Sequence, residues 1–159
     1  MTSPAERVRV LYGWLDRQEW VVRLLIRLGV GVMFFGSGLG KLGKLSGLTQ
    51  YFRSLGIPFP EIQAPFVATT EFLCGFLIVV GLATRPAALM LCGVMSVALV
   101  TAAAPEKKIT ATWHGLLELL YLPEVLLLLL LLSLIVAGAG RASLDAWLAS
   151  RRRGTLRQP

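Results

Sequence analysis

Four side chains that could handle protons or pair charges stand out in this very apolar chain: Lys41, Glu71, His114 and Glu124. Glu71 lies in the stretch 62–84, which contains no other Asp, Glu, Lys or Arg. A charged group inside a membrane is costly unless it is paired or protonated, so Glu71 should face other protein groups. Buried carboxylic acids and an imidazole can exchange protons. The set could therefore move protons or hold a polar head group such as a quinone carbonyl.

Two interpretations of these residues remain open at this point. In the structural one, a Lys41–Glu71 ion pair holds two helices together and Glu124 is solvated at the rim. In the other, an outward-facing polar pocket near Glu71 makes Glu71, Glu124, His114 and Lys41 the catalytic candidates. A Glu71→Gln variant separates the two, because a purely structural pair would lower folding yield and leave the activity per molecule unchanged.

The composition restricts the kind of chemistry. The chain has 159 residues, 55% of them hydrophobic and 16% charged, with a mean hydropathy of +0.70, which is typical of a membrane protein. One histidine and two cysteines cannot supply bis-histidine haem ligation, a four-thiolate cluster or a four-ligand zinc site, and no nucleotide-binding glycine pattern occurs. We expect no metal and no intrinsic cofactor, so an electron carrier would be a diffusing quinone or belong to a partner. Cys74 and Cys92 are expected to be small core hydrophobes, with a redox pair as the minor alternative.

Stretches without charge predict the membrane-spanning helices, since about 20 apolar residues cross a bilayer core as a helix. We expect one domain over 1–159, an all-α, polytopic membrane four-helix bundle. The predicted spans are 21–42, 64–83, 86–104 and 119–140.

The distribution of cations predicts the orientation. Eleven of the 16 lysines and arginines fall on the side that carries both termini, so both ends should be cytoplasmic in a bacterial inner membrane. Short interfacial amphipathic helices are expected in the N-terminal segment 3–20 and, capped by Ser143, in the basic tail 141–159. The net charge of +7 then reflects contact with the anionic cytoplasmic leaflet, and we expect no nucleic acid partner.

Glycines predict close helix packing. Gly29, Gly36 and Gly40 share one stripe, and Gly75 follows Glu71 by one turn. Small residues allow helices to approach closely in lipid. We expect a tight crossing within the chain, with a homo-oligomer contact as the alternative.

Six segments follow one another along the predicted spans in a characteristic order: RLGVG at 27–31, GLGKL at 38–42, YFRSLGIP at 51–58, Glu71 with Gly75, GLATRPAA at 81–88 and GRASLD at 140–145. In these segments the sequence resembles the DoxX family of small bacterial membrane proteins. The resemblance implies a four-helix membrane bundle associated with redox complexes, such as a thiosulfate:quinone oxidoreductase or a mycobacterial oxidant-defence complex. It favours a membrane subunit of a quinone-linked or oxidant-defence complex, with a soluble redox partner; the alternative is a non-catalytic scaffold or assembly factor that anchors a soluble partner.

Overall fold

The computed structural model describes residues 18–103 and 113–155, and these ranges form helices joined by short turns, with no strand among them. The all-α prediction is therefore confirmed for this part of the chain. The predicted helix over 3–20 lies outside the described residues, apart from residues 18–20, of which 19 and 20 belong to the first long helix. The elements are α2 (Glu19–Leu42), α3 (Leu45–Ser54), α4 (Pro60–Val80), α5 (Thr84–Ala98), the π-helix η1 (Leu99–Ala103), α7 (Trp113–Leu120), α8 (Pro123–Ala137) and α9 (Leu144–Thr155).

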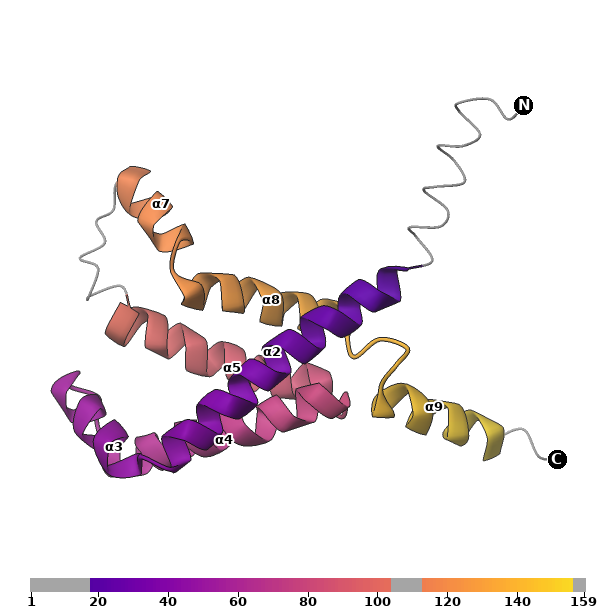
Figure 1. Cartoon of the computed structure of the whole chain (residues 1–159), viewed down its shortest axis with the longest axis horizontal. Coiled ribbons are helices and arrows are strands. Elements are labelled where there is room, and N and C mark those ends of the chain that lie inside the picture. Colours follow the sequence, from indigo (N-terminus) through magenta and orange to yellow (C-terminus); the bar gives the residue numbers. More distant parts are fainter. Residues whose placement is uncertain (1–17, 104–112, 156–159) are drawn as a thin grey trace.

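Four of these helices pack into one bundle (Figure 1). α2 lies against α4, α4 against α5, α5 against α8, and α8 returns to α2. Apolar side chains from all four fill the space between them, with Phe34, Ile78, Leu91 and Leu131 fully buried. Three helices are long and apolar enough to cross a membrane: α2, α4, and α5 continued by η1. Many large apolar side chains remain exposed on the outside of these helices, as expected for a surface that faces lipid.

The helix of the fourth predicted span is shorter than the expected 119–140. α8 has 15 residues and measures about 22 Å, below the roughly 30 Å of a bilayer core. Pro123 explains its start, because the residue before a proline avoids helical angles, and Leu122 is extended with ψ 130°. Gly138, at φ 75°, ends the helix. α7 precedes this break and is turned away from the axis of α8 (Figure 1).

The contact between α2 and α4 is formed at Gly31 and Gly38 of α2 and Gly75 of α4, and not at the predicted stripe of glycines on α2. A Cβ on Gly38 would lie 2.3 Å from the backbone nitrogen of Phe72, and one on Gly75 would lie 2.3 Å from that of Phe35. Gly31 is nearly as close to Val79. Only glycine permits this approach of two backbones.

The expected stripe faces away from that contact. A Cβ added to Gly29, Gly36 or Gly40 would meet nothing within 4 Å, so these glycines make no close crossing within the described chain. Of the four glycines expected at helix contacts, Gly75 lies at the close approach, and the contact between copies of the chain remains the alternative for the other three. Gly29–Gly36 and Gly31–Gly38 have the same seven-residue spacing but lie on different faces of the helix.

At the opposite end from α3, the chain after α8 folds back onto the turn between α4 and α5. Asp145 accepts hydrogen bonds from the backbone nitrogens of Ala83 (3.0 Å) and Thr84 (3.4 Å), and its own nitrogen donates to Gly81 O (3.0 Å). Arg27 is buried there and donates to Ala139 O at 2.8 Å. We call these contacts the clasp. The clasp joins the segments GLATRPAA (81–88) and GRASLD (140–145).

Ser143 caps α9, as predicted. Its Oγ accepts a hydrogen bond from the backbone nitrogen of Ala146 at 3.1 Å. Such a bond satisfies one of the free N–H groups in the first turn of a helix. α9 therefore begins directly at the clasp and leaves the bundle from there (Figure 1).

Candidate functional site

Glu71 is the centre of the polar contacts at the α3 end of the bundle. Its side chain is 1% exposed and receives the ammonium group of Lys41 at 2.5 Å on Oε1 and 2.7 Å on Oε2. Ser37 Oγ donates a further hydrogen bond to Oε2 at 2.9 Å. The buried carboxylate is thus paired and hydrogen-bonded, as a charge in an apolar interior must be.

The local sequence explains this geometry. Ser37 and Lys41 are four residues apart on α2, so they lie on one face of the helix. Gly38 lies on the same side and lets the backbone of α4 approach, which brings Glu71 under both donors. Gly75, one turn further along α4, makes the matching approach to α2. The ion pair therefore depends on a glycine from each helix.

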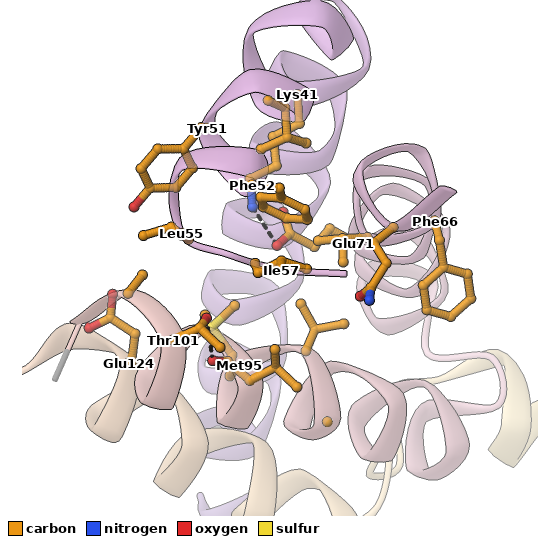
Figure 2. Close-up of a pocket in the computed structure, with 18 of the residues that line it drawn as sticks. Lys41, Tyr51, Phe52, Leu55, Ile57, Phe66, Glu71, Met95, Thr101 and Glu124 are labelled. Atoms are coloured by element: carbon orange, nitrogen blue, oxygen red, sulfur yellow. Dashed lines mark hydrogen bonds and ion pairs between the residues drawn. The ribbon is translucent and has the colours of Figure 1, made fainter. Parts of the chain in front are cut away.

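A cavity of about 380 Å³ lies beside the ion pair, among α2, α3, α4, α5, η1 and α8. Apolar side chains form most of its wall, so it differs from the polar pocket that the sequence suggested. Figure 2 shows the Lys41–Glu71 pair on one side, and Glu124 with Thr101 on the side of α5 and α8. The lining residues are Lys41, Leu48, Tyr51, Phe52, Leu55, Ile57, Gln63, Phe66, Val67, Glu71, Met90, Gly93, Val94, Met95, Val97, Ala98, Thr101, Ala102 and Glu124.

Glu124 lines this cavity at the first turn of α8. Its Oε2 atom is buried and has no hydrogen-bond partner in the described part of the chain. The neighbouring hydroxyl of Thr101 donates its hydrogen to Val97 O at 2.8 Å and therefore does not donate to Glu124. Glu124 as a residue is partly exposed, and one of its two carboxylate oxygens is buried.

Similarity to known proteins identifies the family of this chain. Residues 22–104, which include Lys41 and Glu71, match the DoxX family. The chain belongs to the DoxX family. It is 34% identical over 122 residues to a protein of Bacillus subtilis (strain 168) named "Putative oxidoreductase CatD", an alignment that covers 77% of this chain and 83% of that protein. It is 36% identical over 70 residues to "Inner membrane protein YphA" of Escherichia coli (strain K12), covering 44% of this chain and 50% of YphA. No solved structure is significantly similar.

Three observations together show that this DoxX chain is a membrane protein: the family match, the inner membrane relative and the long apolar helices. The name of the Bacillus relative makes a redox role plausible and assigns no substrate. The six short segments between residues 27 and 145 predict the DoxX family, and this prediction is confirmed.

The structure does not bring His114 into the cavity of this DoxX chain. His114 is exposed on α7 and is not a lining residue. Cys74 and Cys92 are free and buried in the core of the bundle, with no disulfide between them. No group of three or more His, Cys, Asp or Glu side chains within 18–103 and 113–155 is arranged to hold a metal ion.

Three features of the site were not predicted from the sequence. Ser37 completes the shell of Glu71, and its position four residues before Lys41 was a usable signal. α3, which lies between the first two predicted spans, supplies an apolar part of the cavity wall. The π-helix η1 follows α5 directly and contains no proline or glycine that would have predicted the change. It places Thr101 and Ala102 at the cavity.

Proposed function

We propose that this protein is a multi-pass subunit of a redox system in a bacterial cytoplasmic membrane, and that its cavity binds the head group of a membrane quinone. Electrons would come from, or go to, a soluble partner protein at the membrane. The observation that carries the proposal is a largely apolar cavity whose wall contains the Lys41–Glu71 pair.

The chemistry of Lys41 supports this ligand. An ammonium group has three hydrogen-bond donors, and the contacts to the two oxygens of Glu71 leave one of them available. Since Glu71 is already fully paired, Lys41 is the group that would donate to a carbonyl oxygen of a quinone, and Glu71 would position it. Apolar walls with a few placed polar groups are typical of small-molecule sites, and about 380 Å³ lies within the usual range of their volumes.

The test is quinone binding by the purified full chain in lipid nanodiscs, compared with a variant that fills the cavity. Gly93 lines the cavity, and a Cβ there meets nothing within 4 Å, so Gly93→Phe adds a ring without disturbing the backbone. Gly29→Phe is the matched control, because Gly29 is equally open on α2 and does not line the cavity. We expect short-chain ubiquinone or menadione to bind the wild type and Gly29→Phe, and binding to fall at least about tenfold in Gly93→Phe. Equal binding by all three proteins would refute the proposal.

A non-catalytic scaffold that anchors a soluble partner is the second candidate function. The complete pairing of Glu71 at 1% exposure favours it, because such a group can act purely as a lock between α2 and α4. The surface for a partner would be α9, which exposes Trp147 and holds Arg151 over that ring at 4.0 Å. A scaffold should co-purify with a stoichiometric protein that is lost on truncation after residue 143, with no effect of Gly93→Phe.

A further inference from the structure

Two chemically opposite groups line the cavity. Lys41, on α2, can only donate hydrogen bonds. Glu124, on α8, presents a buried Oε2 that has no partner among the described residues. An ionised carboxylate can only accept hydrogen bonds. A ligand that satisfies both must accept at one end and donate at the other.

The backbone near Glu124 is irregular in a way that suits a binding site. α5 changes into the π-helix η1 over Leu99–Ala103, and η1 contacts α8. Short π-helical segments are rare and frequently occur at functional sites. Here the segment brings Thr101 and Ala102 to the cavity wall beside Glu124 (Figure 2). Thr101 Oγ1 donates to Val97 O and is therefore not a donor to Glu124.

From this juxtaposition we infer that Glu124 accepts a hydrogen bond from a ligand hydroxyl, and that the cavity therefore selects the hydroquinone form of its ligand over the quinone form. This rests on the proposed function, that the cavity takes a quinone. A hydroquinone hydroxyl accepts from Lys41 through its oxygen, and the second hydroxyl donates to Glu124. A quinone has two carbonyl acceptors, so its second oxygen would face the carboxylate with no proton between them, which is repulsive.

Replacement of Glu124 tests the inference, because a glutamine amide both donates and accepts. Glu124→Gln can bind a carbonyl and a hydroxyl equally well. Glu118→Gln is the matched control, since Glu118 is exposed on α7 and does not line the cavity. The measurement is anaerobic equilibrium dialysis of the reduced and oxidised forms of one short-chain ubiquinone against full-length protein in nanodiscs.

We expect the wild type and Glu118→Gln to bind the reduced form about tenfold or more tightly than the oxidised form, as a hydrogen bond to a charged acceptor would give. In Glu124→Gln the two affinities should come within about threefold. If the wild type binds both forms equally or prefers the quinone, or if Glu124→Gln keeps the wild-type ratio, the inference is wrong and the proposed function stands. If neither form binds the wild type, the proposed function itself fails.

A second measurement needs no variant. Tighter binding of the reduced form raises the midpoint potential of the bound couple above that of the same quinone in empty nanodiscs. A tenfold preference corresponds to about 30 mV for a two-electron couple. An unchanged or lowered potential would overturn the inference even if Glu124→Gln did not fold.

Discussion

The carboxylate of Glu71 accepts hydrogen bonds from two side chains while only 1% of its side chain is exposed. A buried ion pair of this kind adds little net stability over a well-packed apolar pair, because removing both charges from water nearly offsets their attraction. Loss of one partner is much worse, because the other charge is left uncompensated. At the residue scale, the value of the pair therefore lies in where it holds the Lys41 ammonium group, at the edge of the cavity.

This asymmetry predicts the behaviour of single and double variants. Lys41→Met should lower the free energy of unfolding by about 3–5 kcal/mol, because Glu71 stays buried without its cation. Lys41→Met combined with Glu71→Leu should recover most of that loss and still bind no quinone. Reversible unfolding in mixed detergent micelles measures the first effect, and equilibrium dialysis the second. A double variant as unstable as the single one would show that the pair itself is needed for the fold.

The Glu71→Gln variant keeps the shape of the side chain and removes its charge. The amide oxygen introduced by this change can still accept a hydrogen bond from Ser37, so we expect the protein to fold. Lys41 then loses its ionic partner and its fixed position, and quinone affinity should fall about tenfold. Unchanged affinity at normal yield would mean that Glu71 has no role in binding.

The Lys41–Glu71 contact could be predicted from the sequence, since an acid in a charge-free stretch needs a partner and few cations are within reach. That Oε2 of Glu124 is buried without a partner among the described residues could not be predicted from the sequence. Its surroundings include η1, which contacts α8, and that contact leaves no pattern in the sequence. His114 was included because it precedes the fourth predicted span, but the bend before Pro123 turns α7 away from the axis of α8 (Figure 1).

At the scale of the elements, the seven-residue spacing of glycines on α2 is ambiguous. Gly29–Gly36 and Gly31–Gly38 share that spacing and lie on different faces. What separates them is the position of the polar residues: Ser37 and Lys41 must face Glu71, and Gly38 is three residues before Lys41 on that face. The choice of face thus follows from the buried acid and not from glycine spacing.

Substitution of two neighbouring glycines tests this assignment. Gly38→Ala should lower the free energy of unfolding by at least about 2 kcal/mol, because its Cβ would collide with the backbone of Phe72. Gly36→Ala has open space and should be neutral or up to about 1 kcal/mol more stable. Thermal melts in detergent compare the two. A larger loss for Gly36→Ala would instead point to a contact between copies of the chain at that stripe.

The clasp gives a second prediction at this scale. Asp145→Ala removes the acceptor of the Ala83 and Thr84 nitrogens, which begin α5, and should lower stability by about 1–2 kcal/mol, the range for loss of a helix cap. α9 should also become more sensitive to limited proteolysis. Ser150→Ala is the control on α9, because its hydroxyl bonds only to Trp147 O. Equal protease sensitivity of the two variants would contradict a role for Asp145 in holding α9.

At the scale of the whole molecule, a group of arginines at the clasp and the cavity lie at opposite ends of the bundle. The clasp joins the turn between α4 and α5 to the start of α9, so Arg27, Arg85 and Arg141 gather at that end. The cavity, α3 and the start of α8 lie at the other end. Since arginines and lysines favour the cytoplasmic side, this separation predicts that the clasp and α9 are cytoplasmic and that the cavity lies toward the outer leaflet.

Labelling of single cysteines checks this orientation. Ser54, at the end of α3, and Ser150, on α9, are both exposed, and the hydroxyl of each bonds only to the carbonyl three residues earlier, so Ser54→Cys and Ser150→Cys are a matched pair. In a background with Cys74→Ala and Cys92→Ala, a membrane-impermeant maleimide should label position 54 in right-side-out vesicles and position 150 only in inside-out vesicles. The reverse pattern would place the cavity at the cytoplasmic leaflet, where a quinone would exchange protons with the cell interior. Labelling of both positions in the same vesicles would mean that the two ends of the bundle do not lie on opposite sides of the membrane.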